Sequence, residues 1–257
     1  MLLEIVENRK KQVAIQKNLR TLAELQKSPY FDSPCLSLKE HLQDVGKTGI
    51  IAEFKRASPS KGIINAEANV LYVTAGYRQG GASGLSILTE PTYFQGSDTD
   101  LSKARTVNNI PILRKDFVID EYQIIEAKAL GADAILLIAA CLDKQQARHL
   151  AEVARSLGLE VLFEIHAQEE LDLLPSPDVL IGVNNRNLLT MEVQIETSFM
   201  MASLLSKDFV LVAESGLSQV SDLIELKKVG YTGFLMGEAF MKTADPALAF
   251  QTFVKGL

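Results

Sequence analysis

The sequence predicts an α/β fold, a closed (β/α)8 barrel of the TIM-barrel type with a helical N-terminal extension. From residue 49 onward, short β-type runs alternate with segments of helical spacing, which indicates a parallel sheet with right-handed crossovers. Eight such units fit into about 210 residues, and chains of this fold are typically ~250 residues long. We therefore expect residues 1–257 to form a single barrel domain, with residues 1–47 as an extension packed on it.

The alternative is a doubly wound open sheet, which is built from the same alternation of strands and helices. Such a sheet usually carries a dinucleotide turn with the pattern GxGxxG or a phosphate loop with the pattern GxxxxGK[ST]. Neither pattern occurs in the sequence. The closed barrel is therefore favoured.

The extension is expected to be helical. Residues Leu2–Gln26 are rich in Leu, Glu, Lys and Gln and contain no Gly or Pro, which favours a helix. Ser28-Pro29 ends it, and Leu38–Leu42 is a candidate for a further short helix. Basic residues of the first helix stand beside glutamates, so we expect a solvated face rather than a binding patch. They are Arg9, Lys10, Lys11, Lys17 and Arg20.

The barrel itself is predicted from eight strands and eight helices. The predicted strands are Ile50–Phe54, Gly84–Leu88, Ile110–Leu113, Ala134–Ile138, Glu160–Ile165, Val179–Val183, Phe209–Ala213 and Gly233–Met236. The predicted helices are Val70–Gln79, Asp98–Thr106, Glu121–Ala129, Lys144–Leu157, Gln168–Leu173, Glu196–Leu205, Ser218–Lys228 and Pro246–Val254. Glycines follow several of these helices, as is common where a helix ends.

Composition excludes several kinds of partner. The formal net charge is −6, whereas nucleic-acid binders need a basic face. The longest apolar run, residues 134–142, is far too short to cross a bilayer. Two cysteines without CxxC spacing and three histidines without metal-like spacing argue against a disulfide framework and a metal site. We expect a cytoplasmic monomer or weak homodimer that binds a small molecule, without nucleic acid, membrane, metal or cofactor.

The first predicted strand ends in a carboxylate and an ammonium on one face. Because side chains alternate along a strand, Ile51, Glu53 and Lys55 point to the same side. Burying such a pair costs several kcal/mol per ion unless both find partners, so stability alone rarely explains it. A partnered structural ion pair is the alternative.

Other predicted strands end in the same way, at the barrel end where active sites are built. By parity, Glu164 and Glu214 continue the inward faces of Leu162 and Val212. The polar residues at these ends are Glu53, Lys55, Lys115, Glu164, Asn184, Arg186, Glu214 and Glu238. Carboxylates and lysines that converge on one mouth shift one another's pKa and indicate acid–base chemistry. Asp116, after Lys115, could instead cap the next turn.

The last two strands are followed by small residues that suit an anion. Ser215-Gly216 and Gly237-Glu238 lie where barrels often bind phosphate through backbone N–H groups and a helix N-terminus. A plain turn is the alternative for either pair alone. Their occurrence in adjacent loops favours a phosphate site.

Six blocks of the sequence resemble the indole-3-glycerol phosphate synthase family of tryptophan biosynthesis. They are Ile51–Ser60, Pro111–Phe117, Leu162–His166, Gly182–Leu188, Val212–Leu217 and Gly233–Ala239. They occur in the family's order over nearly the whole chain, and the helical extension is also typical of it. The resemblance implies a lyase that converts 1-(2-carboxyphenylamino)-1-deoxy-D-ribulose 5-phosphate to indole-3-glycerol phosphate by ring closure, decarboxylation and dehydration. It implies no metal or redox cofactor.

The resemblance assigns roles to the charged residues, with Lys115 as general acid and Glu164 as general base. Lys55 would hold the substrate carboxylate or phosphate, or serve as the acid in dehydration, and Glu53 would orient the lysines. The residues that would bind substrate hydroxyls or shape the charge network are Asn184 and Glu214. A lysine is a useful acid near neutral pH only if its pKa falls.

The resemblance also places the two ends of the substrate. The loop residue Ser58 would contact substrate, and Pro59, Phe117 and Leu136 would line the slot for the anthranilate ring, although Leu136 could equally be an ordinary core residue. The phosphate cradle would consist of Ser215, Gly216, Gly237 and Glu238, with Arg186 nearby. Glu238 departs from family members that carry Ser. Since a carboxylate repels phosphate, we expect only its backbone N–H to face the ligand.

Two other functions remain open at this stage. Another phosphate-binding barrel enzyme, such as a phosphoribosyl isomerase, would share the cradle but would not need Lys55, Lys115 and Glu164 together. A non-catalytic phosphosugar-binding protein would keep the cradle without the charged mouth. The presence of the charged residues favours the lyase.

Overall fold

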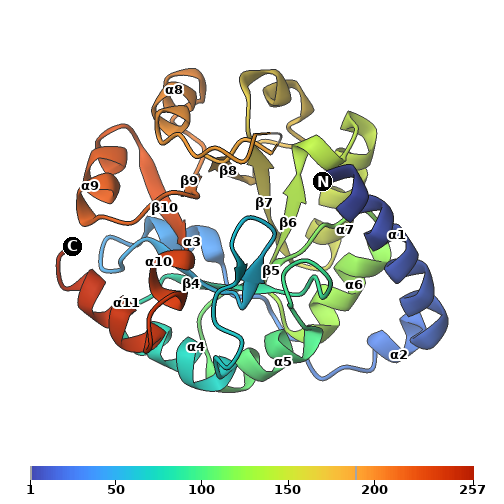
Figure 1. Cartoon of the computed structure of the whole chain (residues 1–257). Helices are drawn as coiled ribbons and strands as arrows, with labels where there is room; N and C mark the ends of the chain where they lie inside the picture. Colours follow the sequence, from blue (N-terminus) through green and yellow to red (C-terminus); the bar gives the residue numbers. More distant parts are fainter. Residues whose placement is uncertain (1, 189) are drawn as a thin grey trace.

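Eight parallel strands close into a barrel in the part of the chain that the structure describes, residues 2–188 and 190–257 of a computed structural model. The strand order around the barrel is β1-β10-β9-β8-β7-β6-β5-β4 (Figure 1). The strands are β1 Ile50–Phe54, β4 Gly84–Leu88, β5 Ile112–Lys115, β6 Ala134–Ile138, β7 Glu160–Ile165, β8 Leu180–Asn184, β9 Leu211–Glu214 and β10 Tyr231–Met236. The predicted barrel is confirmed.

Helices form a ring outside the strands (Figure 1). They are α4 Val70–Gln79, α5 Asp98–Val107, α6 Glu121–Leu130, α7 Lys144–Ser156, α8 Glu196–Leu204, α9 Val220–Lys228 and α11 Pro246–Val254, with a short α10 at Glu238–Met241. A 3-10 helix, η1, follows β6 at Ala139–Cys141. The predicted helix Gln168–Leu173 is instead a 3-10 helix, η2. None of its residues is buried, so packing provides no support for a regular α-helix there.

Several predicted strand boundaries are wrong by one or two residues, and one of these shifts has a consequence for the site. The third barrel strand, β5, covers Ile112–Lys115 rather than Ile110–Leu113. Pro111 has no N–H to donate, and the N–H of Ile112 is taken by the Asp133 carboxylate at 2.8 Å. Lys115 is therefore held by strand pairing with Leu88 of β4 instead of lying in a loop.

The alternation predicted for the first strand is confirmed. Ile51 belongs to the apolar cluster inside the barrel, whereas Ala52 and Phe54 belong to the cluster between strands and helices. The interior cluster also contains Leu113, Leu136, Leu162, Leu180, Val212 and Leu235. Polar residues two positions further along these strands consequently emerge at the C-terminal mouth of the barrel.

The extension folds as α1 Leu2–Leu19, α2 Leu22–Leu25 and α3 Leu38–Gln43. The first helix is shorter than predicted because Thr21 begins a new one. Its side chain accepts a hydrogen bond from the Glu24 N–H, and the Glu24 carboxylate accepts one from the Thr21 N–H, which is a capping box. From α3, Leu38 and Leu42 enter the interior cluster and fill the barrel end opposite the mouth.

The expectation of a solvated basic face on α1 is wrong for Arg9. Only 6% of this residue is exposed, because it lies on the same helical stripe as the buried Ile5 and Val13. Lys10 and Lys17 do lie at the surface, paired with Glu7 and Asp120.

Two further features of the described chain bear on function. A small hairpin, β2 Ala57–Ser58 with β3 Gly62–Ile63, follows β1; the sequence analysis did not predict it. No helix within the described ranges has both the length and the apolar character needed to span a membrane.

Candidate active site

The centre of the candidate site is an ammonium group held between two carboxylates. The Nζ atom of Lys115, at the end of β5, lies 2.7 Å from Glu164 Oε2 and 2.7 Å from Glu214 Oε2. The two acids come from β7 and β9, so three distant segments meet here. Asn184, at the end of β8, donates from Nδ2 to Glu164 Oε1 at 3.1 Å.

A second ion pair stands beside this centre. Lys55 Nζ lies 2.7 Å from Glu53 Oε1, and Ser86 of β4 donates to the other Glu53 oxygen at 3.2 Å. The charge of Glu53 also acts on Lys115. The structure therefore brings both predicted lysines and three of the predicted carboxylates, Glu53, Glu164 and Glu214, into one cluster.

The electrostatics of the cluster favour the charged forms of Lys115 and Glu164. Burial alone lowers the pKa of Lys115, but the charges of Glu164, Glu214 and Glu53 outweigh it and hold that pKa above its ordinary value. Burial raises the pKa of Glu164, and Lys115 and His166 overcome this, so its pKa lies well below the ordinary value. The fall in lysine pKa that efficient acid catalysis requires is thus not present in this state.

Glu214 differs from Glu164. Burial, opposed by Lys115 and reinforced by the charge of Glu164, raises the pKa of Glu214 to about 7. Its Oε1 atom is buried and accepts no hydrogen bond from the described residues. A Cβ atom on Gly182 would stand 2.2 Å from this oxygen, so the glycine makes room for the carboxylate. Glu214 can therefore accept a proton or a hydrogen bond from a ligand near neutral pH.

His166 lies beside the charge cluster, next to the Glu164 carboxylate. Its Nε2 lies 3.1 Å from Glu164 Oε1 and its Nδ1 lies 3.5 Å from Glu170 Oε2, as close electrostatic contacts without hydrogen-bond alignment. Burial lowers the pKa of His166, but Glu164 and Glu170 outweigh this and raise it to about 9. A signal existed, since His166 follows Glu164 by two residues and shares its side of the strand.

The cavity above the cluster has an apolar side. Its lining includes the predicted slot residues Pro59, Phe117 and Leu136, together with Leu2, Ile5, Leu88 and Phe94. The rings of Phe94 and Phe117 lie 6.0 Å apart at 43°. Leu136 belongs both to this lining and to the interior core. An aromatic ring would fit against such a surface.

The opposite side of the cavity has small residues and exposed backbone. Ser215 and Gly216 both have positive φ, 66° and 79°, which turns the chain sharply after β9. A Cβ atom on Gly216 would meet Val193 Cγ1 at 2.5 Å, and one on Gly237 would meet Glu53 Cβ at 2.8 Å. Only glycine fits at these two positions, so backbone can approach a ligand closely there.

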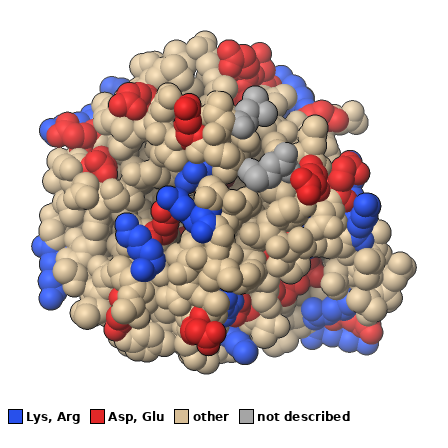
Figure 2. All heavy atoms as spheres, viewed as in Figure 1, with Lys and Arg blue, Asp and Glu red and all other residues tan. Residues whose placement is uncertain are grey.

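The remaining predicted residues lie at the rim. Ser58, Arg186 and Glu238 line the cavity. Glu238 Oε1 is 3.4 Å from Lys61 Nζ of the β2–β3 hairpin, and Arg186 Nη1 donates to Met191 O at 3.1 Å. Figure 2 shows Lys and Arg side chains beside acidic ones near the middle of this face, over the barrel.

Asp116 is not part of the charge cluster, and it does not cap the next helix either, since Asp120 is the N-cap of α6. The Oδ1 of Asp116 accepts from the Phe117 N–H at 2.8 Å, and its Oδ2 pairs with Arg9. No group of three or more His, Cys, Asp or Glu residues suited to a metal ion occurs in residues 2–188 and 190–257.

Comparison with protein families gives a match over almost the whole chain. Residues 2–253 match the model of the family described as indole-3-glycerol phosphate synthase. The indole-3-glycerol phosphate synthase of Bacteroides thetaiotaomicron is 46% identical over 257 residues, covering 100% of this chain and 98% of that protein. The one from Polynucleobacter asymbioticus is 47% identical over 205 residues, covering 79% and 77%.

Solved structures show the same fold at low sequence identity. A tryptophan synthase alpha-subunit from Pyrococcus furiosus matches with a TM-score of 0.58 and 15% identity, covering 80% of this chain and 96% of that one. A mandelate oxidase also gives a TM-score of 0.58 at 15% identity, covering 80% and 71%. At this identity the likeness concerns the barrel alone.

Proposed function

Since the chain belongs to the indole-3-glycerol phosphate synthase family, we propose that the cavity over the barrel mouth is its active site and that the lysine–carboxylate cluster performs the chemistry. The protein is a carboxy-lyase of tryptophan biosynthesis that acts on a small phosphorylated substrate. The reaction closes a ring and then releases carbon dioxide and water. The residue roles that follow are our proposal.

Lys115 is the proposed general acid of ring closure. The anthranilate ring carbon attacks the ribulose carbonyl carbon, and the carbonyl oxygen takes a proton to become a hydroxyl. The raised pKa of Lys115 supports this role, because it keeps the side chain protonated until the proton is needed. The same raised pKa disfavours proton release. We expect bound substrate to donate a hydrogen bond to the Glu214 carboxylate. This contact would weaken the attraction between Glu214 and the Lys115 ammonium, and so lower the pKa of Lys115.

Glu164 is the proposed general base of dehydration. After loss of carbon dioxide has restored the benzene ring, the hydroxyl departs as water and the carbon next to nitrogen loses a proton, which completes the aromatic indole. The lowered pKa of Glu164 keeps it ionised and ready to accept that proton. Lys55 would bind the substrate carboxylate or give the proton to the departing water, and its contact with Glu53 supports an orienting role for that acid.

The two sides of the cavity suit the two ends of the substrate. The apolar side with Pro59 and Phe117 would hold the anthranilate ring, with Leu136 below it and Ser58 at the rim. The backbone of the cradle (Ser215, Gly216, Gly237 and Glu238) would bind the phosphate, with Arg186 nearby. The pairing of Glu238 with Lys61 supports the expectation that its backbone alone faces the phosphate.

We also propose that this chain works in the cytoplasm as a monomer or weak homodimer, without nucleic acid or membrane partners. The net charge of −6 disfavours binding to polyanions.

The observation that carries the proposal is the 2.7 Å contact of Lys115 Nζ with both Glu164 and Glu214. It is tested by following indole absorbance when the purified protein meets the carboxyphenylamino substrate. Wild-type protein should turn over, and Lys115→Met should lose about 10²–10⁴-fold in rate while still binding substrate. Lys61→Met, at the exposed rim, is the matched control and should stay within about twofold of wild type. Full activity of Lys115→Met would overturn the assignment.

A further inference from the structure

Helix α1 reaches the strand end that carries Lys115. Its first turn contributes Leu2 and Ile5 to the cavity lining. One turn further along the same face, Arg9 points into the molecule. The helix therefore lines the cavity with its first turn and contacts the buried residues of the barrel with its second turn.

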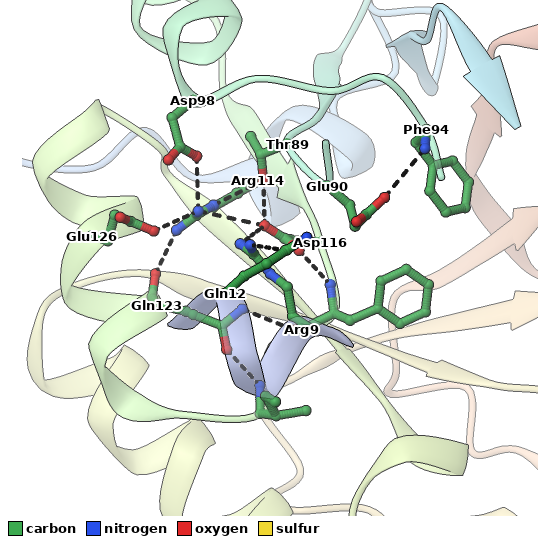
Figure 3. A network of polar contacts seen from close by, with 12 residues as sticks. Arg9, Gln12, Thr89, Glu90, Phe94, Asp98, Arg114, Asp116, Gln123 and Glu126 are labelled. Atoms are coloured by element: carbon green, nitrogen blue, oxygen red, sulfur yellow. Dashed lines mark hydrogen bonds and ion pairs between the residues drawn. The ribbon is translucent and has the colours of Figure 1, made fainter. Parts of the chain in front are cut away.

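Arg9 forms a short, buried ion pair with Asp116. Its Nη2 lies 2.6 Å from Asp116 Oδ2, and its Nη1 donates to Gln12 Oε1 at 2.9 Å (Figure 3). Asp116 is only 2% exposed. The pair joins residues that are 107 positions apart, so it fixes the extension to one point of the barrel.

Asp116 stands between two site residues, Lys115 and Phe117. Its Oδ1 accepts from the Phe117 N–H at 2.8 Å, and its Oδ2 accepts from Thr89 Oγ1 at 2.5 Å. Gln123 of α6 donates to the Phe117 carbonyl at 2.8 Å. The Asp116 carboxylate thus holds the backbone at Phe117, directly after Lys115, which is itself held by strand pairing with Leu88.

The other nearby guanidinium, that of Arg114, is already shared by two other acids. Arg114 is fully buried, and its Nη2 lies 2.7 Å from Glu126 and 2.9 Å from Asp98 (Figure 3). Its distance to Asp116 Oδ2 is 3.4 Å. Because two acids already share Arg114, removal of Arg9 would leave the buried charge of Asp116 poorly compensated.

Gln12, one turn after Arg9 on α1, connects the helix to the segment that carries Phe94, the second aromatic residue of the cavity. Gln12 Nε2 donates to Thr92 Oγ1 at 2.9 Å. Thr92 and Phe94 are both held by the Glu90 carboxylate through their N–H groups, and Phe94 contacts Phe117. Both aromatic rings of the apolar side therefore depend on contacts that begin on α1.

We propose that Arg9 is a positioning residue of the enzyme: through Asp116 it sets the placement of Phe117 and of the neighbouring Lys115. The inference rests on the proposed roles of Lys115 and Phe117. Because a misplacement of about 1 Å can reduce a rate about 10²-fold, removal of this ion pair should affect turnover rather than stability alone.

The test compares Arg9→Met with Lys17→Met. Lys17 is on the same helix and pairs with Asp120 in the same loop region, 2.7 Å apart, but 46% of its side chain is exposed. Arg9→Met should lower kcat about 10–100-fold and raise KM, since both the acid and the ring slot move. Lys17→Met should stay within about twofold of wild type. Arg9→Lys, which keeps the charge without the planar fork, should recover part of kcat.

A double-mutant cycle separates positioning from simple tethering. If Arg9 acts through Asp116, Arg9→Met combined with Asp116→Asn should be no slower than Asp116→Asn alone. If Arg9→Met does not fold, Arg9→Lys and its combination with Asp116→Asn provide the same comparison. Thermal unfolding followed by circular dichroism establishes which variants are folded in the assay.

The inference is overturned if a folded Arg9→Met keeps wild-type kcat and KM. It is also overturned if Arg9→Met and Lys17→Met lose activity equally, or if the losses from Arg9 and Asp116 multiply. Wild-type turnover in the same assay separates this inference from the proposed function. An inactive wild type contradicts the proposed function, whereas an active wild type with an unaffected Arg9→Met contradicts only the role of Arg9.

Discussion

The proposed acid, Lys115, and the proposed base, Glu164, carry opposite charges, and each stabilises the charge of the other. The pKa of Lys115 is raised and that of Glu164 is lowered, so both are ionised before substrate arrives. Glu214, with a pKa of about 7, is the member of the cluster that can change charge near neutral pH.

Replacing His166 with Asn should move the low-pH limb of the kcat profile to higher pH. At neutral pH His166 carries a positive charge, since its pKa is about 9, and it stabilises ionised Glu164 from 3.1 Å. Without that charge the pKa of Glu164 rises, so the base becomes protonated at a higher pH. We expect kcat of the variant to fall below that of the wild type on the acidic limb and to match it near about pH 8.

The control for this experiment is His149→Asn. His149 is exposed and lies 3.4 Å from Glu121 on the outer helices, so its replacement should not change the profile. A His166→Asn profile that coincides with the wild-type profile over the acidic range would show that His166 does not act on Glu164.

Replacing Gly182 with Ala should disturb Glu214. The new Cβ would stand 2.2 Å from Glu214 Oε1 and 3.3 Å from Leu162 Cδ1. The carboxylate must move, and overpacking of this kind typically costs about 1–3 kcal/mol of stability. We expect kcat to fall about 10–100-fold, measured together with the melting temperature. If Glu214 transmits the effect, adding Gly182→Ala to Glu214→Gln should change kcat little further, whereas a fully active Gly182→Ala would contradict the account.

At the scale of elements, the short helix α10 and the β2–β3 hairpin close one side of the cavity. The contact between Glu238 and Lys61 joins them at the rim. Because these side chains are partly exposed, their pairing should contribute little to stability. The positions of the backbone N–H groups matter more for an anion than this side chain does.

Replacing Glu238 with Ser should therefore leave substrate affinity within about twofold of wild type. Gly237→Ala is the contrasting variant, since its Cβ would stand 2.8 Å from Glu53 Cβ, and it should weaken binding. Both are measured as KM and as the dissociation constant of the product. A large gain in affinity on Glu238→Ser would show that the carboxylate faces the phosphate.

Helices and strands were predictable from the sequence where the spacing of apolar residues matches the period of the element. The alternation along β1 placed Glu53 and Lys55 on the inward face, and the structure has them there. The hairpin after β1 was missed because its strands are two residues long and carry no period. The helix predicted at Gln168–Leu173 is a 3-10 helix because nothing buries it.

At the scale of the whole molecule, the barrel converts distant sequence positions into one charged mouth. That convergence was predictable because strand ends of a parallel barrel meet at one face. The buried pair of Arg9 with Asp116 was not, since no local pattern links residues so far apart. A signal for burial was present, however, because Arg9 shares the stripe of Ile5 and Val13.

The charge states of the site residues could not be predicted from the sequence either. Chemistry alone shows that acid catalysis requires a lowered lysine pKa. Whether the pKa of Lys115 is raised or lowered in the folded protein depends on its distances of 2.7 Å to two acids. Only the folded arrangement shows that the carboxylates outweigh burial for Lys115. We therefore expect the pKa of Lys115 to fall only when substrate binds.

The central claim, that Lys115 and Glu164 act as one catalytic unit, is tested most directly by single-turnover indole formation in four proteins. These are the wild type, Lys115→Met, Glu164→Gln and the double variant. Each single change should reduce the rate about 10²–10⁴-fold, and the double variant should be close to the slower single one, because groups that serve one reaction lose their effects together. Wild-type rates in either single variant, or losses that multiply in the double variant, would contradict the claim.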